Sequence, residues 1–306
     1  MISRVRRWHR DLRLFVAHMA GLPIHRFYNL FPGVEFGLTP AEVTRIACHW
    51  TPLAGRRAVH VTDLHLDRYL PRHHAAVEQI AALNPDWIFV TGDFLNVADG
   101  LPHLEKFLVE LRALAPVYLT LGNHDHYSEI PVWRFADMAD RNKLTLLVNQ
   151  VAIQTVGPGD LCIVGLDDPT LHRADPSCIP PRPPDRFTLV LAHAPVVLDL
   201  LTEEHQTDLV LCGHTHGGQW HLPGIPPFWL PYGCQGRASG FFSRNGHHLY
   251  VNRGLGWSGL PFRYNCPPEI LLIEWVVNRR LATESVRALP VHDYARSDPS
   301  LLSSRG

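Results

Sequence analysis

The chain contains the run Asp86-Trp-Ile-Phe-Val-Thr-Gly-Asp93, an apolar segment that ends in a glycine and a carboxylate. The segments 58–62 and 116–121 have the same character, and the helix-like stretches 73–83 and 101–114 separate the three. Short apolar runs bounded by polar residues are typical of buried strands, whereas apolar spacing by three and four is typical of helices. This β-α-β-α-β order predicts right-handed crossovers and a largely parallel sheet.

The second half of the chain is predicted to form further strands joined by loops. A hairpin is predicted at 144–148 and 151–156, joined at Asn149-Gln150. Further strands are predicted at 161–166, 187–192, 208–212, 248–252 and 269–276, with a helix near 196–204 and loops at 176–184 and 221–237.

We expect three regions along the chain. Residues 1–55 form an N-terminal extension of helical pieces, residues 56–280 form one folded domain, and residues 281–306 form a polar, partly disordered tail. The helical pieces are broken at Pro23, Pro32 and Pro52.

The composition is that of an ordinary folded protein. Of the 306 residues, 46% are hydrophobic and 19% are charged, and the net charge is −1. A net charge near zero argues against nucleic acid as a partner, because the chain lacks a global basic field. The six cysteines form no Cys-x-x-Cys pair. This argues against a zinc knuckle or a thioredoxin-like site and favours a reducing, cytoplasmic compartment.

The first residues carry a basic stretch followed by a short apolar one. Arginines up to Arg13 precede the segment Leu14–Leu22, and Arg6-Arg7 is a twin-arginine pair. No apolar run reaches the roughly 18 residues that a membrane span needs. Three interpretations stay open: an amphipathic helix on the protein surface, a membrane-surface anchor whose arginines meet lipid phosphates, and an export signal.

Side chains that bind metals follow five of the predicted strands. In an open α/β sheet, ligands bind at the edge where the strands end, so these side chains are expected to meet. Asp-x-His and Gly-Asp occur often by chance, whereas Gly-Asn-His-Asp is rare and all five motifs in one order are rarer still. The motifs are Asp63-x-His65, Gly92-Asp93, Gly122-Asn123-His124-Asp125, His193 and Gly213-His214-x-His216.

Spacing and chemistry predict two divalent metal ions here. Residues two apart on an extended segment point the same way, so Asp63 and His65 would hold one ion together, as would His214 and His216. Carboxylate, imidazole and amide ligands suit Mn²⁺, which we favour, or Fe or Zn²⁺, and the absence of thiolates argues against structural zinc. Seven candidate ligands are too many for one tetrahedral ion. Two ions about 3.5–4 Å apart that share Asp93 would use them all.

This order of motifs resembles the calcineurin-like metallophosphoesterases over about residues 58–276. The resemblance implies an α/β fold, namely a four-layer α-β-β-α sandwich with two mixed sheets, and makes 56–280 a metallophosphoesterase domain. By the family pattern, the first ion is held by Asp63, His65, Asp93 and His216, and the second by Asp93, Asn123, His193 and His214.

The resemblance also implies catalytic roles and an enzyme, a hydrolase of phosphate esters. In the family, paired cations make hydroxide available near neutral pH and neutralise phosphoryl oxygens. His124 is not a ligand in that pattern and is expected to stabilise developing charge and to protonate the leaving oxygen. Asp125 is expected to orient the His124 imidazole and raise its pKa.

A narrower resemblance comes from motifs late in the chain. Gly213–Gln219, Leu249–Gly256, Pro261 and Pro268-Glu-Ile270 resemble a bacterial branch of membrane-associated phosphodiesterases. That branch includes a UDP-2,3-diacylglucosamine pyrophosphatase of lipid A synthesis. The resemblance implies a phosphodiester or pyrophosphate substrate, small or lipid-linked, and allows peripheral attachment to the inner membrane.

Two features are candidates for substrate contact. The uncharged stretch Leu222–Tyr232 would receive acyl chains or touch a membrane if exposed, and otherwise its aromatic residues fill the core. Arg253 and Arg263 are candidates for binding substrate phosphate, with surface ion pairs as the alternative. A phosphomonoesterase would share every metal ligand. A non-catalytic scaffold of the same fold is the other alternative, although such scaffolds lose ligands that this chain keeps.

Overall fold

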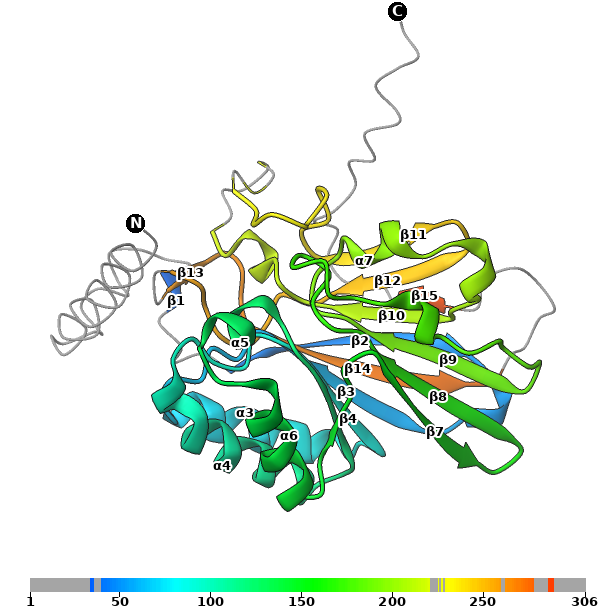
Figure 1. Cartoon of the computed structure of the whole chain (residues 1–306), viewed down its shortest axis with the longest axis horizontal. Helices are drawn as coiled ribbons and strands as arrows, with labels where there is room; N and C mark the ends of the chain where they lie inside the picture. The colour runs from blue at the N-terminus through cyan, green and yellow to red at the C-terminus, as the bar shows by residue number, and fades with distance from the viewer. Residues whose placement is uncertain are drawn as a thin grey trace, which may run out of the picture.

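The computed structural model has four layers (Figure 1). It describes residues 34–35, 40–220, 225, 227, 229–259, 262–277 and 286–288, the first and last of these ranges as backbone only. The helices are α3 (Pro71–Leu83), α4 (Leu101–Arg112), α5 (Asn123–Tyr127), α6 (Val132–Arg141) and α7 (Val197–Leu200). Helices α3, α4 and α6 cover the outer face of one sheet, and α7 covers the outer face of the other. Short 3-10 turns lie at Thr51–Leu53, Ala98–Gly100, Pro176–Cys178, Glu203–His205 and His216–Gly218.

The larger sheet has seven strands in the order β15-β2-β14-β3-β4-β5-β6. Strands β3 to β6 are parallel to one another, as the alternation of strands and helices predicts. Strand β14 is antiparallel to β3 and parallel to β2, so the sheet is mixed. The strands are β2 (Glu42–His49), β3 (Arg57–Val61), β4 (Trp87–Thr91), β5 (Val117–Thr120), β6 (Thr145–Leu146), β14 (Glu269–Val276) and β15 (Val286–Ala288).

The smaller sheet has six strands in the order β11-β12-β10-β9-β8-β7. Its four central strands are parallel, and both edge strands are antiparallel to their neighbours. The predicted sandwich with two mixed sheets is therefore confirmed. The strands are β7 (Gln150–Val156), β8 (Gly159–Gly165), β9 (Arg186–Leu191), β10 (Leu209–Cys212), β11 (Gly240–Arg244) and β12 (His247–Val251). A separate pair joins β1 (Val34–Glu35) to β13 (Arg263–Tyr264).

Alternate residues of a central strand face different layers, which explains why these strands are apolar throughout. In β4, Ile88 and Val90 pack against the covering helices, whereas Trp87 and Phe89 pack between the two sheets. In β9, Val190 packs beneath α7. A strand buried on both faces carries its polar groups at its ends. The fold therefore concentrates polar chemistry at the edges of the sheets.

Residues 42–49 form a strand, so the prediction of helical pieces for residues 1–55 is wrong there. Strand β2 runs parallel to β14 from the pair Glu42 and Glu269 to the pair His49 and Val276. The larger sheet thus includes residues that the sequence analysis assigned to the extension. Residues 1–33 and 36–39, with the arginine-rich stretch, lie outside the described residues. So does most of the predicted tail, of which β15 pairs with β2.

The hairpin predicted at 144–148 and 151–156 is also wrong. Strand β6 pairs with β5 in the larger sheet, whereas β7 pairs with β8 in the smaller sheet. The chain crosses between the sheets here, and Leu147 is buried between them. Two adjacent apolar runs do not reveal whether they pair with each other or with distant strands. Strand β11 was not predicted, and the helix predicted near 196–204 ends at Leu200.

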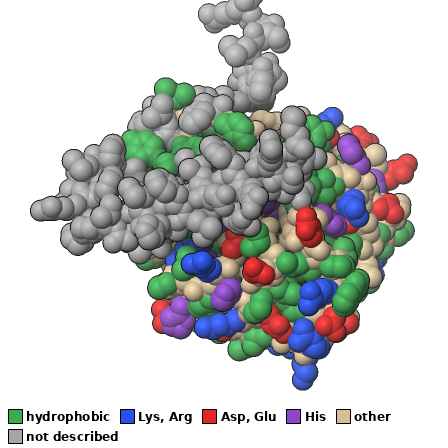
Figure 2. Space-filling view, turned by 60° about the vertical axis from the view of Figure 1, so that its left-hand side comes forward, with side chains coloured by type: hydrophobic (Ala, Val, Ile, Leu, Met, Phe, Trp, Pro, Cys, Tyr) green, Lys and Arg blue, Asp and Glu red, His purple; other side chains and the backbone are tan. Residues whose placement is uncertain are grey.

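Charges of both signs are mixed on the surface. On the face in Figure 2, the visible Lys and Arg side chains lie among Asp and Glu side chains. The described part of this face therefore shows no continuous basic patch of the kind that binds nucleic acid. Within the described residues, no helix combines the length and the apolar character needed to cross a membrane.

The core between the sheets is expected to dominate stability. Trp275 is 1% exposed and its ring makes edge contacts with Trp87 and Phe187. We expect Trp275→Ala to lower the free energy of unfolding by about 3–5 kcal/mol, because it removes buried area and leaves a cavity. Val277→Ala, two residues on and 54% exposed, is the control and should change it by about 0.5 kcal/mol or less. Equal effects in urea denaturation would contradict this assignment of the core.

Candidate metal centre

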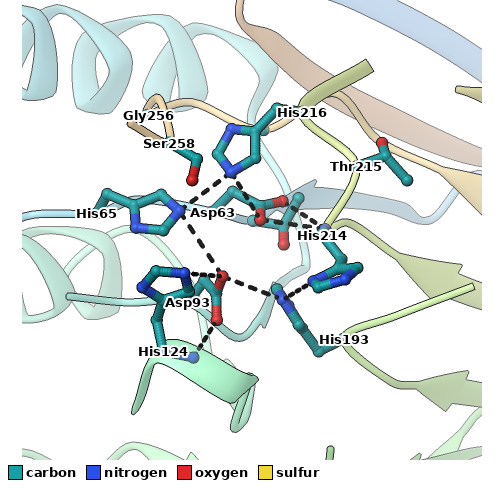
Figure 3. A network of polar contacts seen from close by, with 12 residues as sticks. Asp63, His65, Asp93, His124, His193, His214, Thr215, His216, Gly256 and Ser258 are labelled. Carbon is teal, nitrogen blue, oxygen red and sulfur yellow. Dashed lines mark hydrogen bonds and ion pairs between the residues drawn. The ribbon is translucent and has the colours of Figure 1, made fainter. Parts of the chain in front are cut away.

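The polar motifs that follow the strands converge at one edge of the sandwich (Figure 3). Asp63 and Asp93 follow β3 and β4 of the larger sheet, whereas His193 and His214 follow β9 and β10 of the smaller one. The centre therefore lies where the carboxyl ends of strands from two sheets meet. Ligand atoms lie within 4.8 Å of one another in a first group of Asp63, His65 and His216 and in a second group of Asp93, His193 and His214; those of His65, Asp93 and His124 also do so, in a set that links the two.

Strained backbone accompanies this convergence. Five predicted ligands have a positive φ, in the left-handed region that residues other than glycine rarely adopt. Such conformations persist where the surrounding structure imposes them, and they cluster at functional sites. The residues are Asp63 (51°), His65 (42°), Asp93 (51°), His214 (70°) and His216 (49°).

In the first group, two imidazoles and a carboxylate face one another. Nε2 of His65 lies 3.1 Å from Nε2 of His216, which lies 3.4 Å from Oδ1 of Asp63. The other ring nitrogen of His65, Nδ1, lies 2.9 Å from Oδ1 of Asn96. A proton on Nδ1 is donated to this amide oxygen, which leaves the lone pair of Nε2 facing the group.

The second group has the same construction. Nε2 of His193 lies 3.2 Å from Oδ2 of Asp93 and 3.1 Å from Nδ1 of His214. The outer nitrogens of both rings meet main-chain carbonyls: Nδ1 of His193 lies 2.9 Å from Thr91 O, and Nε2 of His214 lies 2.7 Å from Tyr232 O. These carbonyls accept the ring protons, so the inner nitrogens are available as electron-pair donors.

Asp93 lies between the groups. Its Oδ2 is 3.7 Å from Nε2 of His65, 3.2 Å from Nε2 of His193 and 4.0 Å from Nε2 of His124. Its Oδ1 accepts a hydrogen bond from the main-chain nitrogen of His124 at 2.8 Å. The carboxylate is therefore held in a position from which it reaches both groups.

Asn123 supplies an observation that points to a cation. Its side chain is 7% exposed, and its Oδ1 is buried with no hydrogen-bond partner among the described residues. An unpaired buried amide oxygen costs free energy unless another group takes it as a ligand. The donor set of carboxylates, imidazoles and one amide oxygen fits divalent cations such as Mn²⁺, Fe or Zn²⁺.

The buried charges are set by their neighbours. Burial opposes ionisation of Asp93, but His193 and His124 outweigh it and hold the pKa of Asp93 well below its usual range. Burial also opposes the charged form of His193, yet the carboxylate of Asp93 raises the pKa of His193 well above its usual value. Asp93 and His193 thus form an ion pair that a cation would replace.

His216 and His214 are kept neutral. Burial, assisted by His65 and Arg263, holds the pKa of His216 well below its usual range. Burial and then His193 lower the pKa of His214 to about 4. Burial raises the pKa of Asp63 to about 7. Neutral imidazoles are the form that binds metals, so His214 and His216 are ready to bind a cation at neutral pH, whereas His193 must first lose its proton.

His124 differs from the other histidines in its access to solvent. Its side chain is 29% exposed, whereas those of His65 and His193 are 1% and 0% exposed. Asp125 directs its two oxygens to the main-chain nitrogens of Phe94 and Gly122, each at 2.8 Å. It therefore shapes the turn that carries His124, and its predicted role in orienting the imidazole stays a prediction.

The two arginines predicted to bind substrate are engaged with protein groups. Arg253 contacts Glu42 at 2.8 Å and Glu269 at 3.2 Å, which is the ion-pair alternative. Arg263 is 1% exposed and donates to the carbonyl oxygens of Gly256 and His216. It ties together the two loops beside the first group. A contact of either arginine with substrate phosphate stays a prediction.

The sequence analysis missed the groups that orient the rings. Asn96 and the carbonyl of Tyr232 carry no motif, and their partners are distant in sequence. A further acidic pair, Asp167-Asp168, follows β8 just as the predicted ligands follow their strands. Applying the same rule to the predicted strand 161–166 would have found this pair.

The family of the chain follows from comparison. The model for the calcineurin-like phosphoesterases matches residues 56–218. The chain therefore belongs to the calcineurin-like metallophosphoesterase family, and the predicted family resemblance is confirmed.

Several relatives carry names that describe an activity. The chain is 32% identical over 223 residues to the uncharacterized metallophosphoesterase YkuE of Bacillus subtilis, covering 71% of this chain and 77% of that one. It is 29% identical to the phosphodiesterase YaeI of Escherichia coli, covering 71% and 80%. It is 28% identical to the UDP-2,3-diacylglucosamine pyrophosphatase LpxG of Chlamydia trachomatis, covering 72% and 84%. A solved dimetal phosphatase from Danio rerio has 12% identity and a TM-score of 0.42, covering 65% and 88%.

Close packing of the turns at the centre makes Gly92 sensitive. A Cβ there would lie 2.5 Å from the nitrogen of Gly122 and 2.7 Å from Nδ1 of His193, and φ is +73°. We expect Gly92→Ala to lower the free energy of unfolding by about 1–2 kcal/mol through strain and by about 1–3 kcal/mol more through overpacking. The variant should also bind less metal. Gly157→Ala is the control, since its φ of +60° gives the same strain with no atom within 4 Å. Urea denaturation measures the free energy of unfolding, and metal analysis measures the metal bound. Equal losses in Gly92→Ala and Gly157→Ala would contradict the close approach of neighbouring atoms to Gly92.

Proposed function

We propose that this metallophosphoesterase hydrolyses phosphodiesters or pyrophosphates with two divalent metal ions. The observation that carries the proposal is the position of Asp93, whose Oδ2 lies within reach of both groups of ligand atoms. One carboxylate between two clusters of imidazoles is the arrangement expected of a bridged pair of ions.

The proposed ligand sets follow the family pattern and the observed groups. We assign the first ion to Asp63, His65, Asp93 and His216, and the second to Asp93, Asn123, His193 and His214. Mn²⁺ is the favoured ion, with Fe and Zn²⁺ as alternatives. When bound, such ions supply a hydroxide near neutral pH and neutralise the phosphoryl oxygens.

His124 is the proposed general acid. The ring of His124 is partly exposed, lies 4.9 Å from the His65 ring and is anchored through its own main-chain nitrogen to Asp93. This places an ionisable imidazole at the mouth of the centre, where it would protonate the leaving oxygen. Asp125 supports it by holding the turn between Gly122 and α5.

The substrate is proposed to be small or lipid-linked, such as UDP-2,3-diacylglucosamine. The names of YaeI and LpxG support a diester or diphosphate. The loop after the last metal motif supports an apolar portion: Ile225, Trp229 and Tyr232 are 55%, 52% and 74% exposed. Because the carbonyl of Tyr232 accepts a hydrogen bond from Nε2 of His214, the end of this loop lies beside the metal centre. The loop would also allow peripheral contact with a membrane surface from the cytoplasmic side.

Two substitutions at the centre are expected to distinguish a metal ligand from the general acid. Asp93→Asn should lose bound metal and activity together, because Asp93 serves both ions. His124→Ala should keep its metal, while kcat falls about 10²–10⁴-fold for an alkyl leaving group and less for a nitrophenyl group, which departs without a proton. Metal analysis after dialysis measures the bound metal, and steady-state kinetics measures kcat. His74→Ala on the exposed face of α3 is the control. Full activity in His124→Ala would show that His124 is not the general acid.

Substrate preference tests the diesterase against the monoesterase. With Mn²⁺ present, kcat/KM should be about tenfold or more higher for bis-aryl than for mono-aryl phosphate, because the proposed site discriminates by differential transition-state binding. The reverse preference would favour the phosphomonoesterase. Absence of turnover on either, and on UDP-2,3-diacylglucosamine, would favour the non-catalytic scaffold.

A further inference from the structure

An acidic pair lies beside the metal centre without belonging to any of its groups. Asp167 and Asp168 follow β8, which runs parallel to β9 with Gly165 opposite Leu191. The pairing continues past the strands, since the nitrogen of Leu166 donates to the carbonyl of Leu191 at 2.9 Å. His193 follows β9 directly, so the pair and this proposed ligand leave adjacent strands at the same edge.

The hydrogen-bond partners of Asp167 give it a structural role. Its Oδ1 lies 2.6 Å from Nε2 of His126 and accepts the main-chain N–H of Asp168 at 2.8 Å. His126 belongs to α5, the short helix that also carries Asn123 and His124. Asp167 therefore ties the end of β8 in the smaller sheet to a helix attached to the larger sheet.

Asp168 has one satisfied oxygen and one unsatisfied oxygen. The side chain is fully buried, and its Oδ1 accepts hydrogen bonds from Oγ1 of Thr170 and from the nitrogen of Leu171. Its Oδ2 is buried with no hydrogen-bond partner among the described residues. A buried carboxylate oxygen without a donor is costly, so positive charge nearby is needed to offset it.

Asp168 and His193 influence each other electrostatically. Burial raises the pKa of Asp168, whereas His193 opposes the shift. In return, the charge of Asp168 contributes to the raised pKa of His193, after the larger contributions of Asp93 and Asp63. Asp168 thus acts on the ligands of the second ion. Among the described residues, it belongs to none of the groups whose ligand atoms lie within 4.8 Å of one another.

We propose that Asp168 is an outer carboxylate of the metal centre, which strengthens binding of the second divalent ion through its charge without coordinating it. This rests on the proposed function, since it takes Asp93, Asn123, His193 and His214 as the ligands of that ion. Asp168 is a positioning and charge-balancing residue. Thr170 and Leu171 hold its Oδ1 and thereby fix the direction of its Oδ2. Partners outside the ligand shell commonly change metal affinity by about 10–100-fold.

The test is Mn²⁺ binding by the full chain after removal of metal with a chelator. Asp168→Asn keeps the shape and an oxygen for Thr170 and Leu171, and removes the charge. By calorimetric titration, we expect the Kd of one of the two Mn²⁺ ions to rise about tenfold or more, while that of the other changes much less. In thermal unfolding, the metal-free variant should lose much less Tm than Asp208→Asn, because the oxygen that loses its charge has no hydrogen-bond partner among the described residues.

Asp208→Asn is the matched control. Asp208 is 3% exposed but has its partner, Arg182, at 2.9 Å, and it lies before β10, at the end opposite the metal centre. This variant should lower the metal-free Tm and leave Mn²⁺ affinity unchanged.

Each other outcome overturns a defined part of the argument. If the wild type binds two Mn²⁺ ions and Asp168→Asn binds them equally well, Asp168 has no outer role and the proposed function stands. A Tm loss of the metal-free variant as large as that of Asp208→Asn would mean that the carboxylate is fully paired within the protein, which also overturns the inference. A wild type that binds fewer than two Mn²⁺ ions would overturn the dinuclear function together with the role of Asp168.

Discussion

The buried carboxylate of Asp93 needs positive charge around it, and the rest of the centre is arranged to meet that need. Burial alone would keep the acid neutral. Instead, His193 and His124 hold the pKa of Asp93 well below its usual range. Room for the His193 ring depends on Gly92 and Gly122, because a Cβ at either would lie within 3 Å of an atom of that ring. The charge on Asp93, its partners and the turns around it form one unit.

The sandwich makes this arrangement rigid. Three apolar clusters fill the spaces between the four layers, so the strands present polar groups at their ends. Each ring is then aimed by a bond on its outer side: His65 by Asn96, His193 by the carbonyl of Thr91, and His214 by that of Tyr232. Rings held in this way need little reorganisation to bind a cation, which favours affinity.

Sequence reasoning succeeded where local signals and chemistry agree. The early strands and helices were predicted within a few residues, because hydrophobic periodicity reports burial directly. It failed where pairing is non-local. Glu42–His49 joins the sheet through β14, more than two hundred residues away, and Thr145–Leu146 pairs with β5 rather than with the next strand. Arg253 illustrates the same limit, since its acidic partners come from distant strands.

The sequence by itself determined the class of fold and the family, because motifs of carboxylates and imidazoles after five strands, in one order, leave few alternatives. It predicted the types of metal ligand from the same motifs. It also indicated that Asp93 would be shared. Tertiary structure decided which nitrogen of each histidine faces the centre and that Arg263 is buried and bonded to the carbonyl of His216. It also decided that Asp168 follows the strand next to that of His193, with an oxygen that has no hydrogen-bond partner among the described residues. These depend on how two sheets meet, and contacts between segments far apart in the chain leave no local pattern in it.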